Sequence, residues 1–207
     1  MDTLIIEKKN EVYITVDCDP NVQRELSEFF TFYVPGYKFM PAFRNRMWDG
    51  KIRLFSQKTK EIYFGLFPYI KAFAEEREYH IVCGKDVEVK NKVDKDIVEK
   101  FSNSLGQKFE ARDYQVDAIY HSLKYNRALL LSPTASGKSF IIYALIRYYT
   151  HLIKDETNNR ILLIVPTTSL VEQMYSDFKS YGWNVEKNCH RLYSGYSNQT
   201  DKKVLIS

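Results

Sequence analysis

The sequence predicts an α/β protein in two parts, a small α+β domain followed by a domain with a parallel sheet. Its 207 residues exceed the ordinary size of one domain. Short β-branched runs dominate the first part, whereas apolar strands alternate with amphipathic helices in the second. Alternating charge separates the two patterns, so we expect domains at 1–84 and 106–207, joined by a charged linker or surface helix at 85–105.

The first domain is predicted from β-branched runs and one clear helix start. Residues 4–7 and 12–16 are expected to be strands. Asp19 and Pro20 are typical of an N-cap and a first helical turn. Apolar side chains follow them at helical spacing, namely Val22, Leu26, Phe29 and Phe30. A strand, a helix and a last strand are then expected at 62–64, 68–78 and 79–83.

Residues 36–60 concentrate positive charge between aromatic side chains. Asp49 is their only acidic residue, against seven basic ones: Lys38, Arg44, Arg46, Lys51, Arg53, Lys58 and Lys60. Residues 1–35 have the opposite balance, with three basic and seven acidic side chains. Positive charge with interleaved aromatics is typical of a surface that contacts a phosphate backbone.

The pair Asp49-Gly50 suits a tight hairpin turn before a strand at 51–55. If both segments flanking the turn are strands, alternation brings four cations together on a surface beside Trp48. Such a surface suits phosphate contacts and stacking on an unpaired base, which makes these residues nucleic-acid candidates: Arg44, Arg46, Trp48, Lys51 and Arg53. Alternatively, the segment is a hydrophobic core with a solvated rim. In that case Trp48 is partly exposed and four other aromatic residues are core: Tyr37, Phe39, Phe43 and Phe55.

Beyond Phe109 the pattern alternates between helices and strands. Helices are expected at 113–124, 138–151 and 169–181, and strands at 127–131, 161–165 and 204–206. Because these strands are continuously apolar, they predict a parallel sheet that helices cover on both faces.

A candidate phosphate-binding loop lies between one such strand and helix: Ser132-Pro133-Thr134-Ala135-Ser136-Gly137-Lys138-Ser139. Backbone N–H groups of such a loop bind phosphate oxygens, with help from the dipole of the following helix. Lys138 is expected to reach the terminal phosphates of ATP, and the Ser139 hydroxyl to ligate Mg²⁺, so both are candidate catalytic residues. The strict pattern begins with Gly, where this sequence has Ser132.

The loop resembles motif I of superfamily two helicases, in which the first Gly is often replaced. The run Phe109-Glu110-Ala111-Arg112-Asp113-Tyr114-Gln115 resembles their Q motif. This resemblance implies that Gln115 pairs with the adenine edge and that Phe109 or Arg112 packs on the ring. The run Ile164-Val165-Pro166-Thr167-Thr168-Ser169-Leu170-Val171-Glu172-Gln173 resembles motif Ia. It implies contacts to a nucleic-acid backbone, with four candidates: Pro166, Thr167, Thr168 and Gln173.

Both domains resemble the UvsW-type helicases of T-even-like phages. The less common blocks that carry this resemblance run through 36–44, 48–54 and 64–66. The resemblance implies that 106–207 is an incomplete first RecA-like lobe, and that the whole protein is an ATP-dependent DNA helicase. Such enzymes unwind branched DNA in recombination, replication and repair. We expect a monomer without an obligate protein partner, in the cytoplasm of the phage's host.

An Asp-Glu pair after an apolar strand is absent beyond Phe109, and so is a second lobe. Hydrolysis needs both the acidic pair and arginines of a second lobe. We therefore expect an amino-terminal part of a helicase, which binds ATP and DNA but does not translocate.

A membrane-spanning protein and a protein built on a zinc site or a disulfide framework both fit the sequence poorly. No apolar run is long enough to span a membrane. The three cysteines lie far apart without metal-site spacing, at Cys18, Cys83 and Cys189. Two alternatives to the helicase remain open, a different phosphate-loop enzyme such as a small kinase, and a DNA-binding module with a vestigial nucleotide site.

Overall fold

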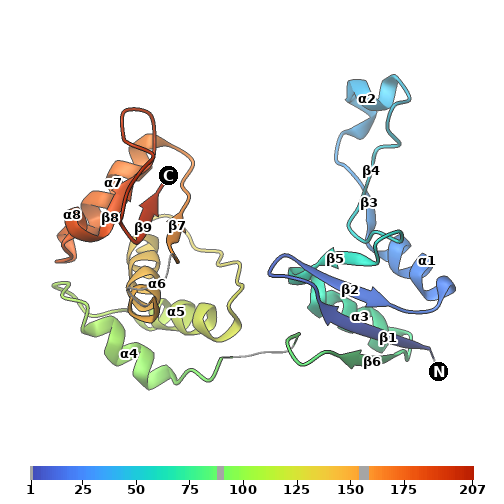
Figure 1. Ribbon diagram of the computed structural model, residues 1–207, viewed down its shortest axis with the longest axis horizontal. Coiled ribbons are helices and arrows are strands. Elements are labelled where there is room, and N and C mark those ends of the chain that lie inside the picture. The colour runs from blue at the N-terminus through green and yellow to red at the C-terminus, as the bar shows by residue number, and fades with distance from the viewer. Residues whose placement is uncertain (1, 88–90, 154–158) are drawn as a thin grey trace. The chain divides into compact units, whose positions relative to one another are not determined.

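The buried apolar residues form two separate cores, one in each of two units, Met1–Val89 and Lys90–Ser207. The computed structural model describes residues 2–87, 91–153 and 159–207 (Figure 1). None of the helices in these ranges has the length and apolar character needed to cross a bilayer. The division into units lies inside the stretch that the sequence analysis assigned to the linker.

Unit 1 is built on a mixed four-stranded sheet of order β5-β2-β1-β6. Its strands are β1 (Thr3–Lys8), β2 (Tyr13–Asp17), β5 (Glu61–Tyr63) and β6 (His80–Cys83). β6 is parallel to β1, whereas β2 is antiparallel to both β1 and β5. Burial alternates along the two central strands, because α1 (Pro20–Phe29) and α3 (Phe67–Glu76) share one core cluster with one face of the sheet. These elements agree with the strands and helices expected for the first domain.

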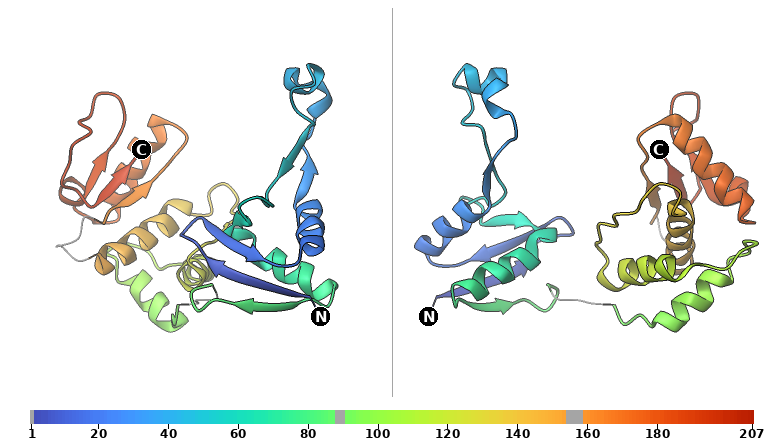
Figure 2. Two further views of the ribbon diagram at one scale, coloured as in Figure 1. Left: turned by 45° about the vertical axis from the view of Figure 1, so that its right-hand side comes forward. Right: turned by 180° about the vertical axis from the view of Figure 1, so that it is seen from behind.

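A two-stranded ribbon projects from the unit 1 sheet (Figures 1 and 2). It pairs β3 (Thr31–Tyr33) with β4 (Lys51–Arg53) in antiparallel register. The 3-10 helix Tyr37–Phe39 and the short helix α2 (Pro41–Arg44) lie at its far end. We call residues 31–53 the arm.

Aromatic side chains hold the arm together. The Tyr37 ring stacks on Tyr33 with centroids 4.7 Å apart and meets Phe43 edge-on at 4.8 Å. Gly50, at φ +78°, lies against the same ring, since a Cβ there would be 2.3 Å from a Tyr37 ring carbon. Only glycine has both the freedom of φ and the small size that this approach requires.

The predicted hairpin turn at Asp49-Gly50 is wrong. The partner of β4 is β3, and the segment expected to be the first hairpin strand, 43–47, begins with the end of α2 instead. Pro41 explains the difference, because proline suits the first turn of a helix and cannot donate to a strand ladder. The core alternative is also wrong for Phe39, which is 83% exposed, whereas Phe55 is buried and Trp48 half-buried as expected.

Unit 2 contains a three-stranded parallel sheet of order β7-β9-β8. Its strands are β7 (Ile161–Leu163), β8 (Cys189–Arg191) and β9 (Val204–Ile206). The principal helices are α5 (Asp113–Tyr125), α6 (Lys138–Leu152) and α7 (Thr168–Ser180), and α8 (Val185–Asn188) is short. In the segment expected to be a linker, α4 (Lys95–Asn103) buries Val98 in the unit 2 core. It is a surface helix of this unit.

The strand expected at 127–131 is absent, and its leucines are not buried. Leu129 is 86% and Leu131 90% exposed, and the segment joins none of the sheets in the described part of the chain. On the edge strand β7 and just beyond it, Leu162 and Ile164 are also more than half exposed. A strand needs the backbone of a neighbouring strand as hydrogen-bond partner, and a parallel sheet is normally covered on both faces. The expectation of a sheet covered on both faces is therefore wrong here.

Substitution of Gly50 tests the construction of the arm. Gly36 also has a positive φ, +73°, but nothing lies within 4 Å of a Cβ placed there. Gly36→Ala therefore adds only backbone strain of about 1–2 kcal/mol. Gly50→Ala adds a collision with Tyr37, so we expect much faster tryptic cleavage within the arm than in Gly36→Ala. Equal cleavage rates in the two variants would show that this packing does not hold the arm.

Candidate nucleotide and nucleic-acid sites

The candidate phosphate loop leads directly into α6. Gly137 is the N-cap of this helix at φ +79°, and Ala135 is also left-handed at φ +64°. Two left-handed residues bend the loop so that the amino terminus of α6 opens onto it. The first N–H groups of a helix have no acceptor within the helix, which makes this terminus suited to an anion. The helix expected after the loop is therefore present, whereas the strand expected before it is not.

The Lys138 side chain folds back over the loop. Its ammonium donates to the carbonyl oxygen of Pro133 at 2.7 Å and to that of Ser132 at 3.3 Å. The Ser136 hydroxyl donates to the Pro133 carbonyl at 2.9 Å and contacts the Ser132 hydroxyl. A phosphate oxygen is a stronger partner for an ammonium than a neutral carbonyl is. Lys138 is therefore placed to exchange these carbonyls for a bound phosphate.

The candidate Q motif is hydrogen-bonded to the phosphate loop. Gln115 is 4% exposed, and its Nε2 donates to the carbonyl oxygen of Ser136 at 3.1 Å. Its Oε1 accepts from the Arg112 backbone N–H at 3.0 Å, which caps α5. These bonds use one of the two amide N–H groups and one of the two oxygen lone pairs. The pairing of Gln115 with adenine stays a prediction that the remaining N–H and lone pair leave open.

Tyr114 is a participant that the sequence analysis did not select. Its hydroxyl donates to the same Ser136 carbonyl oxygen at 3.0 Å and accepts from the Arg112 guanidinium at 2.9 Å. Phe109 is 46% exposed and meets Phe140 edge-on at 5.1 Å, next to the loop. The sequence offered one signal for Tyr114, namely an aromatic residue directly beside the motif glutamine. Neither Thr134 nor Ser139 is fully buried.

The candidate motif Ia forms the turn from β7 into α7. The Thr167 side chain caps the helix, since its hydroxyl oxygen accepts from the Leu170 N–H at 3.3 Å. The candidates of this turn are all exposed: Pro166, Thr167, Thr168 and Gln173. Because β7, β8 and β9 are parallel, their carboxyl ends share one edge of the sheet, where this turn lies.

An ion pair joins α7 to β8, and the sequence analysis did not anticipate it. The Arg191 guanidinium bonds the Glu172 carboxylate at 2.7 Å and lies 4.3 Å from the Tyr175 ring and 4.5 Å from the Tyr196 ring. Hydrogen bonds from the Tyr193 hydroxyl and from Arg191 lower the pKa of Glu172. No local pattern marks the ion pair of Arg191, because Glu172 lies on a different element, 19 residues earlier in the chain.

The four cations expected on one hairpin face do not lie on one face. Arg44 ends α2, and Arg46 follows in a left-handed conformation at φ +58°. On β4, the Lys51 ammonium lies 4.9 Å from the centre of the Tyr33 ring. The Arg53 guanidinium pairs with Asp49, and this hydrogen bond lowers the pKa of the Asp49 carboxyl. Arg53 is thus partly neutralised within the arm.

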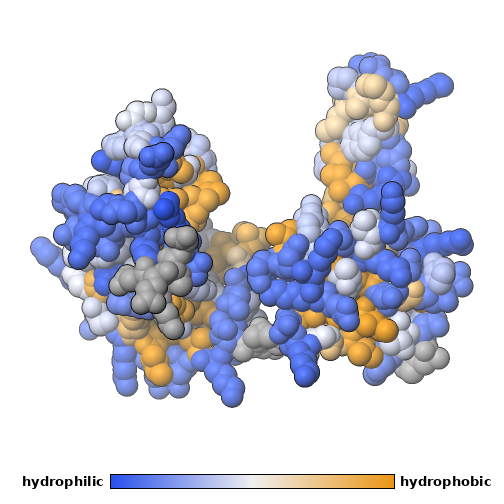
Figure 3. Space-filling model, in the orientation of Figure 1, coloured by the Kyte–Doolittle hydropathy of each residue, from blue (hydrophilic) through white to orange (hydrophobic). Residues whose placement is uncertain are grey.

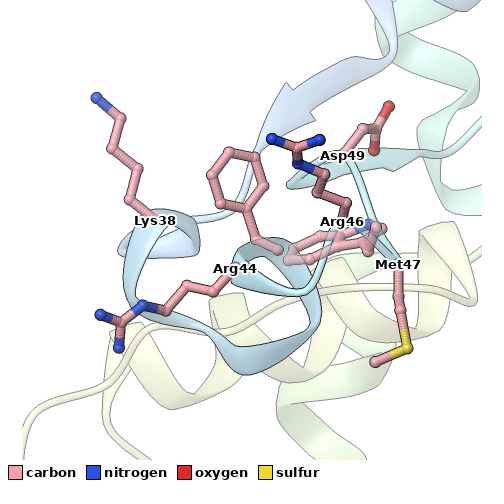
Figure 4. A pocket seen from close by; sticks show the side chains of 7 residues that line it. Lys38, Arg44, Arg46, Met47 and Asp49 are labelled. Atoms are coloured by element: carbon pink, nitrogen blue, oxygen red, sulfur yellow. The ribbon is translucent and has the colours of Figure 1, made fainter.

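An open cavity of about 590 Å³ lies at the end of the arm (Figure 4). Its walls combine apolar, aromatic and charged side chains: Lys38, Phe43, Arg44, Arg46, Met47, Trp48 and Asp49. Figure 4 shows Lys38 and Arg44 on one side and Arg46, Met47 and Asp49 on the other. The indole N–H of Trp48, which also lines the cavity, donates to the Lys51 carbonyl oxygen at 2.9 Å and so fixes the orientation of the ring. Arg44, Arg46 and Trp48 therefore line one cavity, although the predicted hairpin does not form.

Comparisons with known proteins match both units. Residues 5–84 match the family described as DNA helicase UvsW, N-terminal, and residues 112–207 match the DEAD/DEAH box helicase family. Over 174 residues, 82% of its length, the chain is 34% identical to the ATP-dependent DNA helicase uvsW of Enterobacteria phage T4. It spans about a third of that relative, 34% of its length.

Solved structures agree with these matches. The crystal structure of the UvsW helicase from Bacteriophage T4 has a TM-score of 0.86 and 30% identity, over 100% of this chain and 74% of that one. A second crystal structure of T4 UvsW has the same TM-score of 0.86 at 31% identity, over 100% of this chain and 42% of that one.

Gln115 is expected to hold the phosphate loop in place. Gln115→Ala removes both of its buried hydrogen bonds, and an unsatisfied buried group costs about 1–3 kcal/mol. Tyr114→Phe is the matched control, since it removes only the more exposed bond to the Ser136 carbonyl. We expect faster hydrogen exchange in peptides covering 132–139 for Gln115→Ala than for Tyr114→Phe, with unchanged exchange in α7. Wild-type protection in Gln115→Ala would contradict this role.

Proposed function

The chain belongs to the UvsW family of superfamily two DNA helicases, and from this premise we propose that its two units supply nucleotide binding and DNA binding to an ATP-dependent helicase. The observation that carries the proposal is the hydrogen bonding of the Q-motif residues Tyr114 and Gln115 to the Ser136 carbonyl of the phosphate loop. A loop that only led into α6 would need no such connection to α5.

ATP is bound by unit 2 in this proposal. The loop residues Thr134, Ala135, Ser136 and Gly137 surround the phosphates, and Lys138 approaches the terminal ones. The Ser139 hydroxyl ligates the Mg²⁺ that accompanies the nucleotide. Phe109 and Arg112 flank the base, with Gln115 at its edge. Each of these residues belongs either to the loop or to the segment that leads into and begins α5.

DNA is bound by both units. On the arm, Arg44 and Arg46 are exposed at the far end and Lys51 lies on β4, so all three are suited to phosphate contacts. Arg53 contributes less because Asp49 already pairs with it. In unit 2, Pro166, Thr167, Thr168 and Gln173 offer hydroxyl, amide and helix-start groups to the backbone of a strand. The substrate of the whole protein is branched DNA, which it unwinds as a monomer inside the cell.

Lys138→Ala tests the nucleotide site. The substitution removes the charge that meets the terminal phosphates, so Mg²⁺-ATP binding should weaken at least tenfold while the fold stays intact. Isothermal titration calorimetry with Mg²⁺-ATP measures the change. Lys179→Ala is the control, because Lys179 is an exposed lysine of the same unit that bonds Glu186. Unchanged ATP affinity in Lys138→Ala would disprove the assignment of this loop.

A salt series tests the arm. Replacing both Arg44 and Arg46 by Ala should weaken DNA binding and flatten its salt dependence, by a log–log slope of about 0.7–0.9 per lost phosphate contact. Arg53→Ala is the matched control, since its guanidinium already bonds Asp49, and it should change the slope less. The measurement is fluorescence anisotropy of labelled duplex and forked DNA. The same slope in the double variant and in wild type would mean that these arginines contact no phosphate.

A further inference from the structure

We propose that the cavity at the end of the arm binds one unpaired nucleotide, so that the arm prefers DNA in which an unpaired base adjoins a duplex. This inference rests on the proposed function, because it assigns a substrate to the DNA-binding arm. The occupant is inferred from the size of the cavity, the chemistry of its walls and the rigidity of its rings.

The cavity combines two kinds of wall that a nucleotide satisfies together. Its volume of about 590 Å³ lies within the range of about 300–1,000 Å³ that is usual for small-molecule sites. Phe43, Met47 and Trp48 provide apolar and aromatic surface for a base, and the cations Lys38, Arg44 and Arg46 provide partners for its phosphate. A free phosphate would contact only the cations of the cavity, and an apolar ligand would contact only its rings.

Charge in the arm favours an anionic occupant. Between Pro35 and Trp48 the sequence has three basic residues, Lys38, Arg44 and Arg46, and no acidic one. The acid that lines the cavity, Asp49, is bonded to Arg53. The apolar wall is also accessible, since the Met47 residue is 74% exposed. Figure 3 shows apolar surface reaching the end of the arm beside hydrophilic surface.

The aromatic walls have fixed orientations. The Trp48 indole donates to the Lys51 carbonyl oxygen. Phe43 packs against Tyr37, which in turn stacks on Tyr33 and lies against Gly50. Rings that are already ordered lose little conformational freedom when a base stacks on them. The cavity is therefore a preformed stacking site.

Only an unpaired base can use this site. In a duplex, each base is covered by its neighbours in the stack, and removing it costs unpairing and unstacking energy. The cations contact phosphates whether or not the bases are paired. The cations thus supply general affinity for DNA, and the cavity supplies the preference for an unpaired nucleotide.

The test compares two DNAs with the full chain. One is a fork whose first unpaired nucleotide is 2-aminopurine, and the other is a blunt duplex with the same number of phosphates and a paired 2-aminopurine. Trp48→Ala should weaken fork binding about tenfold, as expected for the loss of one base–aromatic stack, with little effect on the duplex. It should also abolish the 2-aminopurine quenching that the wild type produces on the fork. Trp48→Phe keeps a ring and should retain most of both effects.

Phe39→Ala is the matched control, because Phe39 is an 83% exposed ring at the end of the same arm that does not line the cavity. It should leave the fork preference unchanged. Equal loss on both DNAs with Trp48→Ala, or no loss, overturns the inference. Loss of the preference with Phe39→Ala instead of Trp48→Ala also overturns it, since the exposed tip would then act without the cavity. A wild type that binds both DNAs equally refutes only this inference, whereas one that binds neither refutes the proposed DNA binding.

Discussion

The candidate nucleotide site is organised around one carbonyl group, that of Ser136, which accepts hydrogen bonds from both Tyr114 and Gln115. These bonds join the first turn of α5 to the phosphate loop, and the capping contact from Arg112 to Gln115 orients the amide that makes one of them. Gly137 and the Gln115 side chain lie so close together that a Cβ on Gly137 would be 2.3 Å from Gln115 Nε2. Gly137 is therefore required twice, for its positive φ and for the room that it leaves to the glutamine.

The arm of unit 1 depends on the packing of its aromatic side chains. A ribbon of two short strands has no core of its own, and isolated hairpins are marginally stable in water. Tyr33, Tyr37 and Phe43 give the arm rigidity by packing on each other. Met47, which lines the cavity, remains largely exposed at the end of the arm. The cations that line the same cavity suit an anionic partner.

Counting charges along the sequence overstates the number of cations that are available to a ligand. Arg53 is paired with Asp49 inside the arm, and Arg191 is paired with Glu172 and held between two tyrosine rings. Arg44 and Arg46 are exposed at the cavity. Paired and exposed arginines differ because of the fold, which brings some carboxylates within reach of a guanidinium and leaves other cations in solvent.

By itself the sequence determined the features that neighbouring residues control. The cap at Asp19 and the principal helices of both units follow from local spacing and turn chemistry, and the structure confirms them. The tertiary structure decided what depends on distant partners. Residues 127–131 form no strand because extended backbone needs a neighbour, β4 pairs with β3 across the arm, and Arg191 meets Glu172 from another element. A hydrogen bond between segments far apart in the chain depends on where the fold brings them, and local residue patterns carry no signal for that placement.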